Sequence, residues 1–211
     1  MADIKQENNN LKGAIILAGG DSKRLGHPKA LLEINGQSLI ELVVGILSSY
    51  FQELTVVTDR PELYDSLPVR VTGDLLKADQ KSPLRGIHAG LSVSNLPYQF
   101  VAACDMPFLN LELIKYMASF AGSYDAVVPR VGRYYQPLHA FYRRSCIGII
   151  EKQVNEGDYK VTDFYEYLKI RFISLSEITL FDPEQKSFIN INTWEDYKKT
   201  LALMNGKRET S

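Results

Sequence analysis

The sequence of 211 residues contains little cysteine, no long apolar run and almost no net charge. Its two cysteines, Cys104 and Cys146, lie far apart and lack metal-ligand spacing, as is typical of a protein from a reducing compartment. No apolar run approaches the roughly 20 residues that cross a bilayer, and the polar first ten residues lack a signal-peptide core. We therefore expect a cytoplasmic globular protein without a membrane segment.

The charge balance argues against a further class of function. The chain has 24 basic and 25 acidic residues and a net charge of -1, whereas general nucleic-acid binders normally carry a basic excess. We expect no nucleic-acid partner, although a local basic pocket for phosphates is compatible with this balance. Length and an apolar fraction of 45% favour one domain over residues 11–204, with flexible polar tails at 1–10 and 205–211.

Short β-branched apolar runs alternate with helix-like segments along the chain. The predicted strands are Ala14–Leu17, Leu54–Thr58, Val69–Thr72, Phe100–Ala103, Ala126–Val128, His139–Tyr142, Arg171–Ser174 and Phe188–Ile191. The predicted helices are Ser38–Tyr50, Leu84–Val93, Leu111–Phe120, Arg144–Glu156, Asp163–Leu168 and Glu195–Met204. This order predicts an α/β fold with a single doubly wound, mostly parallel sheet, Rossmann-like in type. Two close strands around Gly132 predict a β-hairpin, and thus a mixed-sheet extension.

The loop after the first predicted strand combines glycine with positive charge. Gly19 and Gly20 allow backbone N–H groups to approach an anion, and Arg24 and Lys29 follow within ten residues. The spacing matches neither a Walker loop nor a dinucleotide-binding glycine motif, and glycine pairs after strands also form simple turns. The added cations favour a phosphate-binding loop.

Other strand ends carry polar residues whose roles the pattern leaves open. Asp105 closes an apolar strand and could hold a hard cation such as Mg²⁺ or cap the following helix. Asn190 and Asn192 alternate on the last predicted strand and could meet a ligand on one face, although Asn192 could equally cap a turn. Asp74 could bind a ribose or base, or only form a turn.

A helix is expected to begin at Pro83, a favoured first position. Gly86 and Gly90 lie one turn apart on it and make a smooth face. Such a face allows close packing or close approach of a ligand, and we expect packing.

The segments LAGG, SKRLG followed by Lys29, VAACDMPFL, SPLRGIHAGL, QPLHAFY and ININT together resemble the molybdenum cofactor guanylyltransferases. The resemblance covers Lys12 to about Leu203 in the family's order. It implies a nucleotidyltransferase fold of the GT-A type. It also implies transfer of GMP from GTP to the terminal phosphate of molybdopterin, which gives molybdopterin guanine dinucleotide and pyrophosphate. Proteins that deliver the molybdenum cofactor become potential partners.

The resemblance also assigns roles to single residues. Leu17, Ala18 and Gly19 would contact the nucleotide through their backbone, Lys29 would neutralise the triphosphate, Asp74 would hold the nucleoside, and Asp105 would bind Mg²⁺, for which Mn²⁺ could substitute. Arg24, Lys29 and Asp105 form the expected catalytic set. An acceptor phosphate is already anionic, so no general base is required, and positioning with charge neutralisation can supply most of the acceleration.

We further expect the pterin acceptor near the hairpin, where Arg133 could bind its phosphate and Gln136 could both donate to and accept from its edge. Asn190 and Asn192 complete this expected wall. An ordinary exposed hairpin is the competing interpretation.

Some residues depart from the family pattern. Asp21 places a negative charge in the phosphate loop, and the stretch 57–60 lacks an Asn found in some guanylyl enzymes. The alternatives are therefore a cytidylyltransferase for molybdopterin, a sugar-phosphate nucleotidyltransferase, or a nucleotide-binding module without catalysis.

Overall fold

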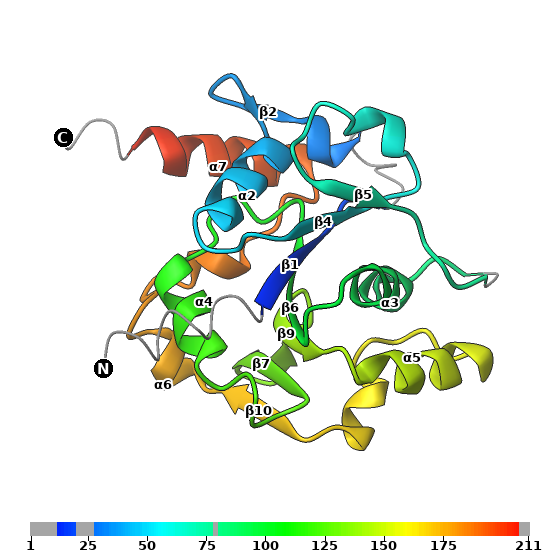
Figure 1. Cartoon of the computed structure of the whole chain (residues 1–211). Helices are drawn as coiled ribbons and strands as arrows, with labels where there is room; N and C mark the ends of the chain where they lie inside the picture. Colours follow the sequence, from blue (N-terminus) through cyan, green and yellow to red (C-terminus); the bar gives the residue numbers. More distant parts are fainter. Residues whose placement is uncertain (1–11, 20–27, 78–79, 207–211) are drawn as a thin grey trace.

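A mixed sheet runs through the centre of the computed structural model, which describes residues 12–19, 28–77 and 80–206 (Figure 1). Within these residues seven strands follow the order β10-β7-β9-β6-β1-β4-β5, and β8 pairs with β7. The strands of this sheet are β1 (Lys12–Leu17), β4 (Leu54–Val57), β5 (Arg70–Thr72), β6 (Tyr98–Ala103), β7 (Ala126–Val131), β8 (Tyr134–Tyr135), β9 (His139–Arg143) and β10 (Ile170–Ile173). A separate small sheet pairs β2 (Glu33–Ile34) with β3 (Gln37–Ser38).

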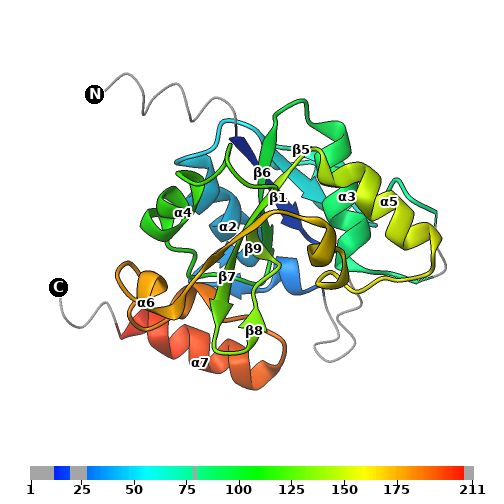
Figure 2. The ribbon, with the colours of Figure 1, turned by 90° about the horizontal axis from the view of Figure 1, so that it is seen from below.

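Helices cover both faces of the sheet, as the alternating sequence predicts. The α-helices are α2 (Leu39–Ser48), α3 (Pro83–Val93), α4 (Leu111–Ala118), α5 (Cys146–Asn155), α6 (Leu175–Ile178) and α7 (Trp194–Asn205). The 3-10 helices are η2 (Lys29–Leu31), η3 (Pro61–Leu63), η4 (Asp163–Tyr167) and η5 (Lys186–Phe188). Figures 1 and 2 show α2 and α4 on one face and α3 and α5 on the other. In the described chain no helix is both long and apolar enough to cross a membrane.

Each face of β1 contributes to a different hydrophobic core, because successive side chains of a strand point to opposite sides. Ile16 packs in the core beneath α2 and α4, with Val43 and Leu113. Ile15 packs in the core beneath α3 and α5, with Ile87. The strand is therefore covered on both sides, which accounts for its wholly apolar sequence.

The strand directions confirm a mostly parallel sheet with a mixed extension. β1 is parallel to β4 and β6, and β4 is parallel to β5. β9 runs antiparallel to β6 and β7, while β10 is parallel to β7. The hairpin expected around Gly132 is present, because Arg130 pairs with Tyr135 across β7 and β8 and Gly132 has a φ of 59°.

The register brings the carboxyl ends of the parallel strands to one edge. Leu17 lies opposite Val57 and Ala103, and Val57 lies opposite Thr72. The loops after β1, β4, β5 and β6 therefore emerge together, and the antiparallel β9 begins at this edge too, since His139 pairs with Ala102. In open α/β sheets ligands gather at such an edge.

One predicted strand was wrong and one predicted helix differs in type. Phe188–Ile191 forms no strand: it begins at the end of η5, and Asn190 Nδ2 donates to its own segment at the carbonyl of Phe188, 3.2 Å away. The alternating pattern arises because Phe188 packs against His139 and Ile191 fills a small core, without strand pairing. The predicted helix Asp163–Leu168 is the 3-10 helix η4.

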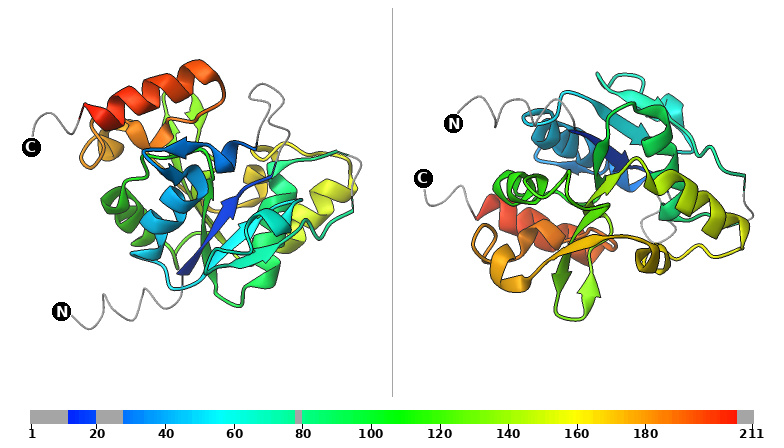
Figure 3. Two further views of the ribbon diagram at one scale, coloured as in Figure 1. Left: turned by 90° about the horizontal axis from the view of Figure 1, so that it is seen from above. Right: turned by 60° about the horizontal axis from the view of Figure 1, so that its bottom comes forward.

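A small layer that was not predicted lies between α2 and α7 (Figure 3). The β2–β3 hairpin turns through Asn35 and Gly36, which have φ values of 54° and 81°, the conformation that Asn-Gly turns favour. Ile34 and Ile191 share its core, and Tyr197 Oη of α7 donates to the carbonyl of Glu33 at 2.6 Å. These contacts tie α7 and the residue Ile191 before it to the β2–β3 hairpin.

Candidate active site

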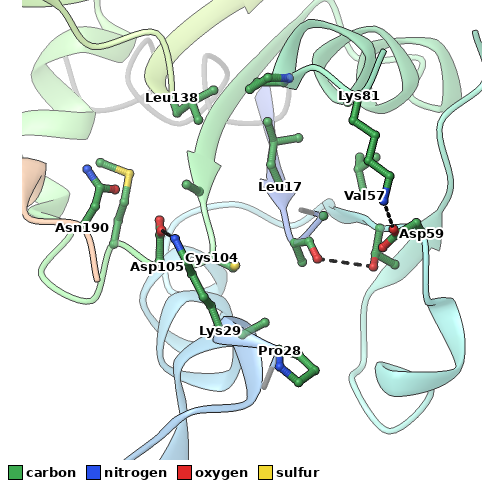
Figure 4. A pocket seen from close by; sticks show the side chains of 18 of the residues that line it. Leu17, Pro28, Lys29, Val57, Asp59, Lys81, Cys104, Asp105, Leu138 and Asn190 are labelled. Carbon is green, nitrogen blue, oxygen red and sulfur yellow. Dashed lines mark hydrogen bonds and ion pairs between the residues drawn. The ribbon is translucent and has the colours of Figure 1, made fainter. Parts of the chain in front are cut away.

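A cavity of about 560 Å³ opens at the carboxyl edge of the parallel strands (Figure 4). Its walls come from the loops after β1, β4, β5 and β6, from the start of α3, from the residues before β9, and from the segment before α7. Of the predicted site residues, those that line it are Leu17, Ala18, Gly19, Lys29, Asp74, Asp105, Gln136, Asn190 and Asn192. Arg24 and the other residues of 20–27 lie outside the described residues. The fold thus gathers most of the predicted site in one place.

The backbone after β1 is held by side chains from other elements. The carbonyl of Ala18 accepts hydrogen bonds from Thr58 Oγ1 and from Tyr64 Oη, both at 3.4 Å. The amide of Ala18 donates to the carbonyl of Val57 at 2.9 Å. Burial raises the pKa of Tyr64 to about 12, so its hydroxyl keeps its proton and remains a donor at neutral pH. These bonds fix the start of the glycine loop that we expected to bind phosphate.

Lys29, Asp105 and Asn192 meet on one side of the cavity. Lys29 lies in η2, and its Nζ donates to Oδ2 of Asp105 at 3.2 Å and to Oδ1 of Asn192 at 2.6 Å. The Asp105 side chain is only 13% exposed. Burial raises the pKa of Asp105, and the charge and hydrogen bond of Lys29 oppose that rise. We call these three residues the phosphate end of the cavity, after the role predicted for Lys29.

Main-chain bonds hold this end in position. The amide of Cys104 donates to the carbonyl of Leu17 at 3.0 Å, which continues the pairing of β6 with β1. The amide of Ile191 donates to the carbonyl of Asp105 at 3.1 Å, so the segment that carries Asn192 is bound directly to the loop after β6. Burial raises the pKa of the Cys104 thiol to about 12, and this thiol is therefore not a nucleophile at neutral pH.

A second pair of charges lies on the other side of the cavity. Asp59 follows β4, Lys81 precedes α3, and Lys81 Nζ is 2.7 Å from Oδ2 of Asp59 (Figure 4). The hydrogen bond from Lys81 lowers the pKa of Asp59. We call Asp59 and Lys81 the distal pair. Neither residue was predicted to be functional, although Asp59 occupies a strand end as Asp105 does, and this position was an available signal.

Asp74 follows β5 and lines the cavity, and it has a partner of its own. Arg85 Nη2 is 3.4 Å from Oδ2 of Asp74 and donates to the carbonyl of Leu76 at 2.6 Å. Burial raises the pKa of Asp74, and the charge of Arg85 opposes that rise. Contact of Asp74 with a nucleoside stays a prediction.

The glycine face of α3 packs against β1, as expected. A Cβ at Gly86 would lie 2.9 Å from Cδ2 of Leu17, and a Cβ at Gly90 would lie within 2.6 Å of Ile15. Both distances are too short for a side chain without displacement of the strand. Ser82 caps α3 by accepting a hydrogen bond from the amide of Leu84. The first turn of α3 reaches the cavity at Pro83 and Gly86.

The residues predicted to bind the acceptor are only partly together. Gln136, Asn190 and Asn192 line the cavity, although the last two lie on an irregular segment and not on one face of a strand. Arg133 does not line it: within the described structure its guanidinium lies over the ring of Tyr134, 5.2 Å from the centroid, on the hairpin. The hairpin therefore brings Gln136 to the cavity and leaves Arg133 outside.

The residues of the phosphate end suit a metal ion that takes few ligands from the protein and most of its ligands from the bound nucleotide and water. Within the described ranges no three His, Cys, Asp or Glu side chains are grouped as a metal site. Mg²⁺ in nucleotide enzymes commonly uses one or two carboxylates together with phosphate oxygens and water. Asp105 supplies one carboxylate, and the Asn190 and Asn192 side chains offer amide oxygens on the same wall.

Comparisons with known proteins agree with this geometry. A family model described as "MobA-like NTP transferase domain" matches residues 14–171. A probable molybdenum cofactor guanylyltransferase of Peptoclostridium acidaminophilum is 37% identical over 193 residues, which are 88% of this chain and 86% of that protein. A molybdenum cofactor guanylyltransferase of Syntrophotalea carbinolica is 35% identical over 188 residues, 88% of this chain and 89% of that protein.

A solved structure extends the agreement to three dimensions. The crystal structure of molybdopterin-guanine dinucleotide biosynthesis protein A from Archaeoglobus fulgidus superposes with a TM-score of 0.81 at 30% sequence identity. The match covers 92% of this chain and 99% of that one. The mixed sheet, the cavity at its carboxyl edge and these matches agree, and the chain therefore belongs to the MobA-like NTP transferase family.

Proposed function

We propose that this protein is a molybdenum cofactor guanylyltransferase, which transfers GMP from GTP to the terminal phosphate of molybdopterin and releases pyrophosphate. The observation that carries the proposal is the phosphate end, where Lys29 is held between Asp105 and Asn192 at the edge of a cavity large enough for a nucleotide. The printed names of the relatives, molybdenum cofactor guanylyltransferases over most of the chain, support the choice of reaction.

The reaction needs charge neutralisation more than proton transfer. An oxygen of the acceptor phosphate forms the new bond to the α-phosphorus of GTP, and the bond from that phosphorus to the bridging oxygen breaks, so that the electron pair leaves with pyrophosphate. The nucleophile is an anion, and no general base is required. Lys29 would supply an ammonium for the triphosphate, and Ala18, whose carbonyl is held by Thr58 and Tyr64, lines the same cavity together with Gly19.

Asp105 would hold Mg²⁺, or Mn²⁺ in its place. When bound, the ion would neutralise phosphate charge in the reaction. Lys29 already donates to Asp105 in the protein alone, and its charge and hydrogen bond favour the ionised carboxylate against the effect of burial on its pKa. Asp105 can accept at both oxygens, so one oxygen can keep the lysine while the other faces a cation.

The acceptor would lie beside Gln136, Asn190 and Asn192, which line the cavity next to the phosphate end. Gln136 offers both a donor and an acceptor for a pterin edge. Arg133 lies outside the cavity, and we therefore do not include it among the acceptor-binding residues. We assign the acceptor phosphate to no other residue. We expect the reaction in the cytoplasm, and proteins that deliver the cofactor stay a separate prediction.

Pyrophosphate release tests the proposal directly. The purified protein with Mg²⁺ is incubated with GTP, CTP, ATP or UTP, with and without molybdopterin, and product dinucleotide is identified by mass. We expect release that requires both GTP and molybdopterin. Preference for CTP would identify a cytidylyltransferase, release with a sugar phosphate in place of molybdopterin would identify the other rival, and nucleotide binding without release would identify a module without catalysis.

A further inference from the structure

The distal pair, Asp59 and Lys81, lines the same cavity as the phosphate end but on the opposite side (Figure 4). Its side chains are 48% and 61% exposed, and their charged atoms are 2.7 Å apart. Ion pairs with this exposure contribute little to stability. Stability therefore gives little reason for this pair, and its place at the wall of a nucleotide-sized cavity makes a role in ligand binding worth testing.

The wall between the two ends is apolar. Leu17 and Val57, at the ends of β1 and β4, lie between the phosphate end and the distal pair in Figure 4. Pro83, at the start of α3, also lines this part of the cavity. A flat heterocycle can pack on such a surface and present its polar edge to groups beyond it. If the triphosphate lies at Lys29, the base of the same nucleotide would extend across this surface toward Asp59.

We propose that Asp59 and Lys81 recognise the Watson–Crick edge of guanine. The Asp59 carboxylate accepts hydrogen bonds from N1–H and from the 2-amino group, and the Lys81 ammonium donates to O6. This assignment rests on the proposed function, because it takes GTP as the nucleotide. It makes Asp59 and Lys81 the specificity-determining residues of the reaction.

The chemistry of the pair fits guanine better than the other bases. A carboxylate only accepts hydrogen bonds and an ammonium only donates them. Guanine presents two neighbouring donors followed by an acceptor, whereas the corresponding edges of adenine and cytosine each present a single donor next to an acceptor, and that of uracil presents a single donor between two acceptors. Lys81 has three donors, so it can hold Asp59 and O6 together. The bond from Lys81 also lowers the pKa of Asp59, which stays an acceptor at neutral pH.

A second pair near the cavity, Asp74 and Arg85, is less suited to recognise a base. Asp74 lines the cavity, but its partner Arg85 is not among the described residues that do so. The Arg85 guanidinium donates to the carbonyls of Leu76 and Gln80, which fastens the loop before α3. The lysine bonded to Asp59 lines the cavity with it, and Asp59 is therefore the better placed of the two carboxylates to share a base with a donor.

Replacement of Asp59 by Asn should weaken the binding of one nucleotide, GTP, and strengthen the binding of another, XTP. Xanthine has a carbonyl oxygen in place of the 2-amino group of guanine, and an Asn amide can accept from N1–H and donate to that oxygen. Dissociation constants for GTP, ITP and XTP with Mg²⁺ are measured by calorimetry for the wild type, Asp59→Asn, Asp74→Asn and Asp163→Asn. Asp163 is the matched control, because it forms a surface pair with Lys160 at 2.6 Å and does not line the cavity.

We expect the wild type to prefer GTP over ITP by about tenfold, since ITP lacks the 2-amino group. Asp59→Asn should weaken GTP about 10- to 100-fold and strengthen XTP. Asp163→Asn should keep the wild-type preferences. A gain for XTP requires a folded variant, so a folding defect cannot imitate it.

Two results would overturn the assignment. If the wild type prefers GTP but Asp59→Asn neither loses GTP nor gains XTP, the base is recognised elsewhere and the proposed function is untouched. If Asp74→Asn instead binds XTP more tightly than the wild type does, Asp74 is the residue that recognises the base. A wild type that prefers CTP would contradict the guanylyl function itself, which the pyrophosphate assay detects independently.

Discussion

The two charged ends of the cavity use the same kinds of residue in different surroundings. At the phosphate end Asp105 and Lys29 are 13% and 24% exposed, whereas Asp59 and Lys81 of the distal pair are 48% and 61% exposed. Burial raises the pKa of Asp105, while the hydrogen bond from Lys81 lowers the pKa of Asp59. Lys29 therefore favours the ionised form of a mostly buried carboxylate, and Lys81 favours that of a carboxylate in contact with water.

This difference matches two kinds of task. A charge that acts on a transition state gains strength in a water-poor environment, where electrostatic interactions are less screened. A pair that selects a base needs correct donors and acceptors and can stay exposed until the ligand covers it. We therefore expect substitutions at the phosphate end to affect rate and those at the distal pair to affect nucleotide choice.

The largest effect is expected at Asp105. Asp105→Ala should reduce transfer by about a thousandfold or more, because it removes the predicted metal ligand and the partner of Lys29. Circular dichroism should show an intact fold, since the side chain belongs to the cavity wall and not to a hydrophobic core. Single-turnover pyrophosphate release at limiting Mg²⁺ measures the loss. Turnover like that of the wild type would remove Asp105 from the mechanism.

Lys29→Ala is expected to have the next largest effect, on the triphosphate. The lysine would face the leaving pyrophosphate, so its loss should weaken GTP roughly 10- to 100-fold and GMP much less. Calorimetric titration of both nucleotides against the wild type and the variant makes the comparison. Equal losses for GTP and GMP would instead place Lys29 at the acceptor or the base.

The sequence sufficed to predict the parts of this site that depend on parallel strands. Leu17 and Asp105 close apolar runs, and strands of that kind end at one edge when they are parallel, so their neighbourhood follows from the pattern. The packing of Gly86 and Gly90 against β1 follows from their spacing of one turn. These are local signals combined with one topological rule.

The remainder depends on contacts that no local pattern encodes. Tyr64 reaches Ala18 across 46 residues and Asn192 reaches Lys29 across 163, and neither partner could be inferred from spacing. The prediction of a strand at Phe188–Ile191 was wrong. The Phe188 ring packs on His139 and the Asn190 side chain bonds to the local backbone, and these contacts gave the sequence a strand-like alternation. The direct contact of Lys29 with Asp105 was also not expected, since each had been given a separate role.

A pH-dependent loss of stability is expected from His139, which begins β9 and pairs with Ala102 of β6. It is fully buried between Phe100 and Phe188, neither ring nitrogen has a hydrogen-bond partner in the described structure, and burial lowers its pKa to about 3. The unfolded chain binds a proton near pH 6.5 and the folded chain does not. Stability from the neutral ring is therefore complete above about pH 6.5 and is lost as pH falls toward 3.

The substitution His139→Leu isolates this contribution. Between pH 7 and pH 4.5 the wild type should lose roughly 2 to 3 kcal/mol more unfolding free energy than the variant. Urea titrations at the two pH values, for both proteins, give the difference directly, and contributions of carboxylates that do not interact with the ring cancel because both chains share them; Asp182 does interact with it. An identical loss in both proteins would mean that the buried ring does not determine acid sensitivity.

A smaller effect is expected on the KM for the acceptor. The hairpin offers a control for it, because Gln136 lines the cavity and Arg133 does not. Gln136→Ala should raise the KM for molybdopterin severalfold, because one or two hydrogen bonds of about 1 kcal/mol each are lost, and leave GTP affinity unchanged. Arg133→Ala should change neither value, since Arg133 lies outside the cavity. Steady-state kinetics with each substrate varied distinguish these cases. A rise for Arg133→Ala alone would show that the acceptor extends over the hairpin.

The smallest effect is expected on stability, from a matched pair of lysine substitutions. Lys81→Met should change the free energy of unfolding by at most about 0.5 kcal/mol, because its pair with Asp59 is largely exposed and screened by water and salt. Lys29→Met should cost more, roughly 1 to 3 kcal/mol, because it leaves the mostly buried Asp105 carboxylate without its ammonium. Urea unfolding at pH 7 without nucleotide measures both. If the two variants lose the same stability, exposure does not separate the two ends, and the division between a buried catalytic charge and an exposed selective pair fails.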